Sequence, residues 1–380
     1  MCSIGKRMGL MNYDYKLPWD EELTKTVANV FDRGNGAIGA VVGSAIADAV
    51  GAGYEFTRGV AESERDDIGP IGGGPFNWKP GQWTDDTEQA VALLGALTND
   101  SDTNVTRAAD NILAWYVSEP ADIGSTTLAV LRAALHHKQV EGSASVEACF
   151  TAARRHAVAH DSHRMDQSPI LTTMQGCGAF MRLSSCALLP TELEAENWAV
   201  ATAMLTHGSI HVANLAASLG PIIWRASRLK GEALDHLFDG VFDHLDSDQK
   251  EAWETLLHDR NPDVASMIGP DKLVAYNGTA PGAMACALLA IVDTTLLHGD
   301  YRIHAERWFR RCIQHAVSQG GDTDSVAAIT GAIAGGIVGY RHLPAAWRQI
   351  LHGFDHDGNL LDENDLVKMS MNALHKIGTS

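Results

Sequence analysis

Residues 36–50 carry the sequence GAIGAVVGSAIADAV, an apolar run in which glycine recurs at positions 36, 39 and 43. Each glycine inside a helix costs about 1 kcal/mol relative to alanine, a cost that is tolerated where a second backbone must come close. Residues 326–339 form a second run of this kind, with glycine at positions 331, 335, 336 and 339. We therefore predict that both runs are helices packed near the centre of the fold.

The first run also resembles a short membrane span, because it stays apolar from Gly36 to Gly53. Asp48 interrupts this run, however, and its flanks carry no basic anchor of the kind that holds a span at the membrane surface. We expect a buried helix and no membrane association.

Helical spacing of apolar residues continues through the rest of the chain. Val105, Ala109, Ile112 and Tyr116 trace one face of a helix, for example, and no segment alternates like a strand for long. The predicted fold class is therefore all-α, with one compact multi-helix domain over residues 34–380. Residues 1–33 differ from it, being polar with one short helix expected over 20–31, and they are predicted to be an N-terminal extension that serves as a partner-binding arm.

Composition limits the partners and the compartment. The chain has 380 residues and a formal net charge of -18, which opposes nucleic acid in bulk and anionic lipid. Its six cysteines show no Cys-x-x-Cys spacing, so we expect reduced, buried thiols. The N-terminus lacks the apolar core of a signal peptide. These features favour a globular protein of the cytoplasm.

Two short acidic clusters stand where apolar sequence should exclude charge: TDDTE at residues 84–88 and GGDTDS at residues 320–325. Each coincides with an expected helix start, where a threonine or aspartate can cap the helix. Capping does not account for paired acids at both places, and crowded carboxylates are unfavourable without cations. Carboxylate and hydroxyl oxygens are hard ligands that suit Mg²⁺ or Mn²⁺ better than Zn²⁺. The clusters therefore predict one site for two metal ions.

The loop before the first cluster, residues 69–83, is rich in glycine and proline and cannot be helix or strand. Its glycine triplet allows the backbone to approach a ligand closely. It lacks the Gly-Lys-Ser/Thr ending of a phosphate-binding P-loop, which disfavours nucleoside triphosphate hydrolysis.

Three stretches in this order resemble the ADP-ribosylglycohydrolase family: GSAIADAVG at 43–51 followed by Glu55-Phe56, GQWTDDT at 81–87, and GGDTDS at 320–325. The resemblance covers about residues 36–375. It implies an all-helical domain that binds two Mg²⁺ ions, or Mn²⁺ in some members, and cleaves the bond between ADP-ribose and an acceptor. The residues that match the metal ligands of the family are Thr84, Asp85, Asp86, Asp322, Asp324 and Ser325.

A further segment, Asp122-Ile123-Gly124, resembles the active-site motif of the arginine-specific branch of that family. Asp122 is a candidate to activate water or to hold a guanidinium leaving group, because carboxylate and guanidinium pair bidentately. The alternative is an N-cap for the helix expected over 125–138. Glu55 is a candidate catalytic acid or base, because it lies just beyond a buried helix where desolvation raises a carboxyl pKa. Its alternative is a surface or capping role.

Gly178 lies in a stretch similar to the family's Asn-Gly-Ser-x-Met-Arg segment near the ligand, although Cys177 and Ala179 replace its two polar residues. His207 matches a Thr-His pair of the family and is predicted to contact the nucleotide. A hydrogen-bonded histidine at a helix end is the alternative. Asp48, inside the first apolar run, is expected to be a buried structural hydrogen-bonding residue.

These residues lead to the hypothesis of a Mg²⁺-dependent hydrolase that removes ADP-ribose from arginine of a modified protein. Two other readings stay open. In one, the chain is an immunity or inhibitor protein whose first 33 residues bind an ADP-ribosyltransferase toxin, with or without hydrolase activity. In the other, the same site acts on a serine-linked or small-molecule ADP-ribose conjugate.

Overall fold

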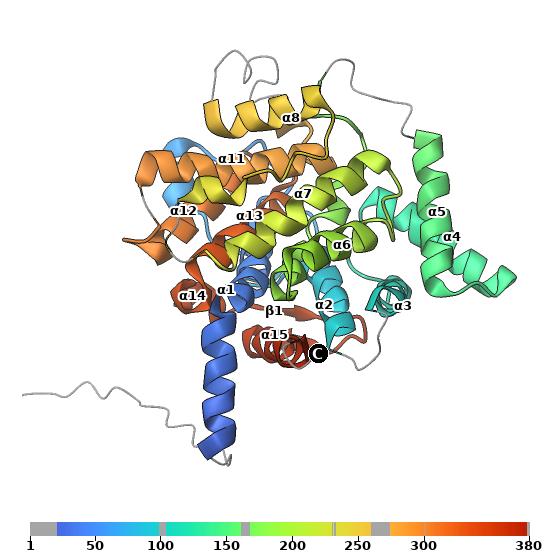
Figure 1. Cartoon of the computed structure of the whole chain (residues 1–380), viewed down its shortest axis with the longest axis horizontal. Coiled ribbons are helices and arrows are strands. Elements are labelled where there is room, and N and C mark those ends of the chain that lie inside the picture. Colours follow the sequence, from blue (N-terminus) through green and yellow to red (C-terminus); the bar gives the residue numbers. More distant parts are fainter. Residues whose placement is uncertain are drawn as a thin grey trace, which may run out of the picture.

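The computed structural model describes residues 21–98, 104–160, 168–229, 231, 233–259, 274–299 and 301–377. Within these ranges the fold is built almost entirely of helices, as Figure 1 shows, which confirms the all-α prediction. The longer helices are α1 (Glu21–Gly51), α2 (Asp85–Leu97), α3 (Asn104–Val117), α4 (Ser125–Glu141), α5 (Ser145–His160), α6 (Glu192–Ala203), α7 (Ile210–Ala226), α8 (Ser247–Glu254), α11 (Ala280–His298), α12 (Ala305–Ser318), α13 (Thr323–Val338) and α15 (Glu363–Ile377).

Short elements fill the connections between these helices. They are η1 (Glu62–Asp67), η2 (Cys177–Ala179), η3 (Leu183–Leu188), η4 (Leu234–Leu237), η5 (Thr255–Asp259), η6 (Tyr340–His342) and α14 (Ala345–Arg348). A small antiparallel hairpin joins β1 (His352–Phe354) to β2 (Leu360–Asp362), with Gly353 opposite Leu361. It lies beside α15, near the C-terminal end of the chain (Figure 1).

The two glycine-rich runs form α13 and the second half of α1, and these helices make the most extensive helix contact in the described part of the chain. A Cβ atom added to Gly39 would lie 2.3 Å from the carbonyl oxygen of Gly335, and one added to Gly331 would lie 2.3 Å from that of Gly43. No side chain fits at such a distance. The prediction of two central helices is therefore confirmed, and the glycines are the reason that their backbones approach so closely.

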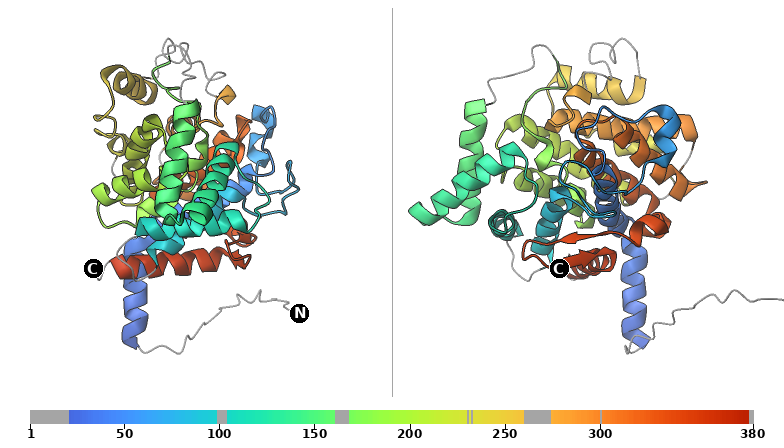
Figure 2. Two further views of the ribbon diagram at one scale, coloured as in Figure 1. Left: turned by 90° about the vertical axis from the view of Figure 1, so that its right-hand side faces the viewer. Right: turned by 180° about the vertical axis from the view of Figure 1, so that it is seen from behind.

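Residues 20–31 and 36–50, predicted as separate helices, are joined in one helix, α1. Gly34 and Gly36 lie within this helix and do not end it, and both pack closely against other parts of the fold. A Cβ on Gly34 would meet the Leu374 side chain at 2.3 Å, and one on Gly36 would meet the Ser227 carbonyl oxygen at 1.9 Å. The N-terminal part of α1 extends away from the other helices, as Figures 1 and 2 show. Residues 1–20 of the predicted arm lie outside the described residues.

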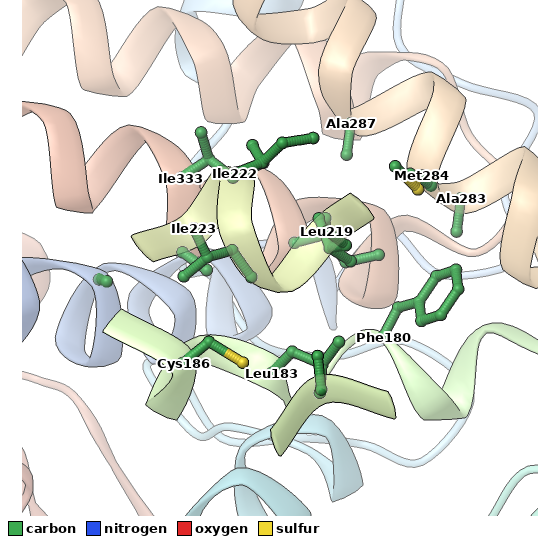
Figure 3. Packing of buried hydrophobic residues seen from close by; sticks show 14 of the residues in the cluster. Phe180, Leu183, Cys186, Leu219, Ile222, Ile223, Ala283, Met284, Ala287 and Ile333 are labelled. Carbon is green, nitrogen blue, oxygen red and sulfur yellow. The ribbon is translucent and has the colours of Figure 1, made fainter. Parts of the chain in front are cut away.

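The core continues from α13 across α7 to α11 and η3. Figure 3 shows the contact, with Leu219 and Ile222 of α7 among Phe180, Leu183, Met284 and Ile333. All of these side chains are at most 1% exposed. This core fixes the segment around residues 177–183, which forms one wall of the site described below.

In the described part of the chain, two helical segments are long and apolar enough to cross a membrane by length and composition, Gly34–Tyr54 and Ala280–His298. Of the most apolar stretch in each, 89% and 67% respectively is buried inside the fold, as in core helices of folded proteins. The cysteines of the described ranges are buried and free, as predicted.

Candidate functional site

A cavity of about 300 Å³ opens where the N-termini of α2, α4 and α13 converge. The loop after α1 and the segment around η2 complete its walls. Five of the six predicted metal ligands line it, as do both predicted catalytic residues and both predicted nucleotide-binding residues. They are Glu55, Asp85, Asp86, Asp122, Gly178, His207, Asp322, Asp324 and Ser325. The fold thus brings together residues that lie up to 270 positions apart (325 − 55).

The acidic half of the cavity is built from two helix starts. Asp85 and Asp86 lie in the first turn of α2, and Asp324 lies in the first turn of α13, where the helix dipole favours negative charge. Ser325 joins the two turns, because its hydroxyl donates to Asp86 Oδ2 at 3.5 Å. The two acidic clusters of the sequence therefore line one cavity. The metal-ligand roles expected for them stay predictions.

Thr84 is the predicted ligand that does not line the cavity. It is the N-cap of α2, and its hydroxyl accepts from the Asp86 amide at 3.3 Å and donates to Asp48 Oδ1 at 2.9 Å. Asp48 also accepts hydrogen bonds from both the amide and the hydroxyl of Thr87. Asp48 is 0% exposed and, as predicted, is a buried hydrogen-bonding residue. It ties α1 to the start of α2 directly behind the acidic group.

The acidic group, which consists of Asp85, Asp86, Asp322 and Asp324, crowds carboxylates together in the cavity wall. Burial first, and then neighbouring carboxylates, raise the pKa values of Asp85, Asp86 and Asp324 well above the ordinary range. Asp86 Oδ1 is buried without a hydrogen-bond partner in the described structure. Carboxylate oxygens of Glu55, Asp122 and Asp324 lie within 4.8 Å of one another. Crowded, unpartnered hard oxygens fit a divalent cation that neutralises them.

Glu55 and Asp122 face this acidic group from two different loops. Glu55 is 7% exposed, which removes the surface role that the sequence left open. Burial, followed by the charges of Asp122 and Asp322, raises its pKa to about 8. Asp122 is half-buried and does not cap α4, whose N-cap residue is Gly124. Burial also raises the pKa of Asp122.

A second part of the cavity offers hydrogen-bond donors. The N-terminus of α4 faces it through Ser125, Thr126 and Thr127, and no side chain caps this helix end. Such an end binds anions through its free amides. Gly178 lies beside it, since a Cβ there would be 3.1 Å from Thr127 Oγ1 and 3.3 Å from His207 Cε1.

His207 is 1% exposed and has a lowered pKa, because burial and then the charge of Arg182 oppose its protonation. The Thr206 hydroxyl accepts from Arg182 at 2.6 Å, so its own hydrogen is free to donate to His207 Nδ1 at 2.8 Å. We therefore assign the imidazole proton to Nε2. Nε2 has no protein partner in the described structure and is a donor available to a ligand.

Arg182 connects the two halves of the site. It is 0% exposed, and its guanidinium donates to Gln89 Oε1 at 2.6 Å as well as to Thr206. Gln89 in turn donates to Asp85 Oδ2 at 3.0 Å. A continuous chain of hydrogen bonds thus runs from an acidic residue to His207. Nothing in the sequence indicates that Arg182 and Gln89, which are 93 positions apart, contact each other.

A second missed contributor is the turn before α11. Asn277 Oδ1 accepts from the Asp322 amide at 3.1 Å, and its Nδ2 donates to the Gly320 carbonyl at 2.8 Å. Asn277 therefore shapes the turn that carries Asp322. Cys177, where the family pattern has asparagine, donates its thiol to Asp322 Oδ2 at 3.0 Å. The Tyr-Asn-Gly-Thr segment before Pro281 marks a helix start, but nothing in its sequence identifies its distant partner.

Comparison with known proteins gives a consistent result. The family model described as ADP-ribosylglycohydrolase matches residues 27–375. The ADP-ribosyl-[dinitrogen reductase] glycohydrolase of Rhodospirillum rubrum is 29% identical over 85% of this chain and 91% of its own. The ADP-ribosylarginine hydrolase Tri1 of Serratia proteamaculans is 26% identical over 86% of this chain and 78% of its own.

More distant relatives share the same extent. The ADP-ribosylhydrolase ARH3 of Mus musculus is 24% identical over 89% of this chain and 90% of its own. Among solved structures, an ADP-ribosylglycohydrolase-related protein complex contains a chain with a TM-score of 0.57 and 22% identity, covering 91% of this chain and 99% of that one. That structural likeness supports the fold.

Divalent cations are expected to stabilise the protein, because they neutralise the acidic group of the folded state only. At a concentration about 100 times the dissociation constant, the gain is about 2.7 kcal/mol. Thermal unfolding with Mg²⁺, Mn²⁺ or a chelator measures it. The shift should shrink from pH 7.5 to pH 5, because protons bound by carboxyls of raised pKa compete with the cation. Asp86→Asn should reduce the shift, whereas Asp357→Asn, on an exposed turn, should not. Equal unfolding temperatures with cation and chelator would contradict a metal site.

Replacing Arg182 is expected to destabilise the fold, because Arg182→Met leaves Gln89 Oε1 and the Thr202 carbonyl without their buried donor. We expect a loss of roughly 2–4 kcal/mol in the free energy of unfolding, measured by urea titration. The exposed Arg132 of α4 gives the matched control, Arg132→Met, which should change that free energy by less than about 0.5 kcal/mol. An Arg182→Met midpoint equal to that of the wild type would show that the hydrogen-bond chain contributes nothing to stability.

Proposed function

The chain belongs to the ADP-ribosylglycohydrolase family, and on this premise we propose that it hydrolyses the N-glycosidic bond between ADP-ribose and arginine of a modified protein. Family membership makes it a hydrolase that acts on glycosidic bonds of ADP-ribose. The position of Asp122 is the observation that supports arginine as the acceptor. Its carboxylate stands in the cavity wall next to the acidic group, with no helix to cap.

The two halves of the cavity suit the two ends of an ADP-ribosyl group. The free amides at the start of α4 and the Nε2 proton of His207 would bind the anionic diphosphate. The distal ribose would then lie at the acidic half. We propose that two Mg²⁺ or Mn²⁺ ions are held there by Asp85, Asp86, Asp322, Asp324 and Ser325, with Thr84 supporting them. When bound, these cations supply charge neutralisation and orientation for ribose hydroxyls.

Asp122 and Glu55 are the residues proposed to serve the reaction itself. A carboxylate at Asp122 can pair bidentately with the guanidinium of the arginine that leaves. Burial raises the pKa of Glu55 to about 8, near neutral pH. In its carboxylate form Glu55 can therefore accept a proton from the attacking water. The water oxygen then forms the new bond to the anomeric carbon as the carbon–nitrogen bond breaks. The water gives its proton to the Glu55 carboxylate, and the departing guanidine takes up a proton and leaves as guanidinium.

The relatives support this choice of linkage without determining it. The Serratia relative is called an ADP-ribosylarginine hydrolase, whereas the mouse relative's name gives no acceptor. A serine-linked or small-molecule conjugate is therefore the competing substrate. We further propose that the protein acts in the cytoplasm on a modified protein, without a membrane or nucleic acid as partner.

Release of free ADP-ribose from arginine-, serine- and acetyl-linked conjugates tests the proposal. We expect release from the arginine conjugate with Mg²⁺ or Mn²⁺ and loss of that activity with a chelator. Asp322→Ala should lower the rate roughly 100-fold or more, because it removes a carboxylate from the cation site. Asp357→Ala, on the exposed turn between β1 and β2, is the matched control and should retain the activity. Release from the serine conjugate alone would show that the linkage is misassigned.

The extended N-terminal part of α1 supports a second proposal, that the chain also guards against an ADP-ribosyltransferase toxin through residues 1–33. Deleting residues 1–20 leaves α1 whole and separates the two activities. We expect the Asp322→Ala variant to protect cells that express an arginine-specific ADP-ribosyltransferase, and the deletion to abolish that protection. Protection that needs Asp322 and survives the deletion would assign it to hydrolysis alone.

A further inference from the structure

A second depression of about 380 Å³ adjoins the catalytic cavity and is more open than it. We call it the acceptor groove; it is formed by the segments 56–58, 274–278 and 319–322. Phe56, Gly278 and Asp322 line both the groove and the cavity. The two spaces therefore share one wall, and that wall lies beside Glu55 and the acidic group.

Phe56 marks the boundary between the two spaces. Its side chain is 69% exposed, and its backbone has a φ of 57°, a conformation that residues with a Cβ atom rarely adopt. Two hydrogen bonds hold it there: the Phe56 amide donates to the Gly321 carbonyl at 2.7 Å, and the Gly321 amide donates to the Thr57 carbonyl at 3.0 Å. The backbone next to Asp322 thus fixes an exposed aromatic ring at the mouth of the site. Strained, exposed positions of this kind are typical of ligand-contacting segments.

Arg58 adds a cationic side chain to the groove, whose lining also contains Asp322 at the shared wall. Its side chain is exposed, and among the described residues it has no ion-pair partner. In a chain of net charge -18, whose neighbouring cavity is lined by carboxylates, this guanidinium is a local positive feature. It does not line the catalytic cavity.

We propose that the acceptor groove binds the polypeptide that carries the ADP-ribosyl group, and that Arg58 favours targets with an acidic side chain close to the modified residue. This inference rests on the proposed function, since a modified side chain whose sugar lies at the acidic half must leave the cavity toward its own backbone. The groove begins at the shared wall and is open to solvent. The Phe56 ring offers the peptide an apolar surface, and Arg58 offers it a charge.

Three substrates test the inference: free ADP-ribosylarginine, a peptide with a glutamate two residues from an ADP-ribosylated arginine, and the same peptide with lysine in place of the glutamate. We expect the wild type to favour the glutamate peptide in kcat/KM by roughly two- to fivefold, the usual size for an exposed ion pair. Arg58→Glu should reverse this preference, through KM, and leave the hydrolysis of free ADP-ribosylarginine unchanged. Arg132→Glu, an exposed arginine of α4 outside both spaces, should behave as the wild type.

Three other outcomes would each contradict one part of this inference or the proposed function on which it rests. Equal peptide preferences in the wild type and in Arg58→Glu would show that the groove does not hold the acceptor peptide. A comparable loss on free ADP-ribosylarginine would assign the groove to the ADP-ribose moiety instead. If the wild type releases ADP-ribose from none of the three substrates, the proposed function itself is wrong and the groove loses its assigned occupant with it.

Discussion

The close approach of α1 and α13 is the constraint on which the site depends. Gly51, the last residue of α1, would place a Cβ 2.5 Å from the Asp324 Cα, and the Thr323 hydroxyl donates to the Gly51 carbonyl at 2.8 Å. The start of α13 is therefore packed directly on the end of α1. Because the protein interior is close-packed, a larger residue at Gly51 would displace Asp324 together with the helix that carries it. The glycines thus set the position of one acidic cluster relative to the loop that bears Glu55.

The other acidic cluster, residues 84–88, is positioned by hydrogen bonds to Asp48. Asp48 projects from α1 and accepts four hydrogen bonds from Thr84 and Thr87, so that α2 begins at a fixed place and angle. Desolvation raises the pKa of Asp48 to about 6, against the opposing effect of these bonds. A buried carboxylate with every acceptor used is a rigid support. Helix α1 therefore orients both acidic clusters. Backbone contact at Gly51 positions residues 320–325, and hydrogen bonds to Asp48 position residues 84–88.

The sequence revealed those features that depend on local chemistry. Helical periodicity predicted the all-α class, repeated glycines predicted the central pair, and paired acids at helix starts predicted the composition of the acidic group. Contacts between residues that are far apart in the sequence were not predicted. Gln89 reads as one more polar residue of α2 until Arg182, 93 positions away, is seen to contact it. Asn277 is an ordinary turn residue until its amide is found on the Asp322 loop. Separate helices were predicted over 20–31 and 36–50, whereas α1 is continuous and its Gly34 and Gly36 make close tertiary contacts.

Site and specificity are separable in this architecture. The acidic group and the donors around His207 are fixed by the core, through Asp48 on one side and Arg182 on the other, and Arg182 links them. Those supports are buried, so a change in them would disturb the acidic residues and the donors around His207 together. Phe56 and Arg58, in contrast, are exposed on the loop after α1, where substitution alters contacts without disturbing packing. The relatives that match this chain at 24–29% identity carry names that differ in the target they state. Under the proposed function, selection of the acceptor would belong to this exposed loop, and the buried core would hold the sugar for hydrolysis.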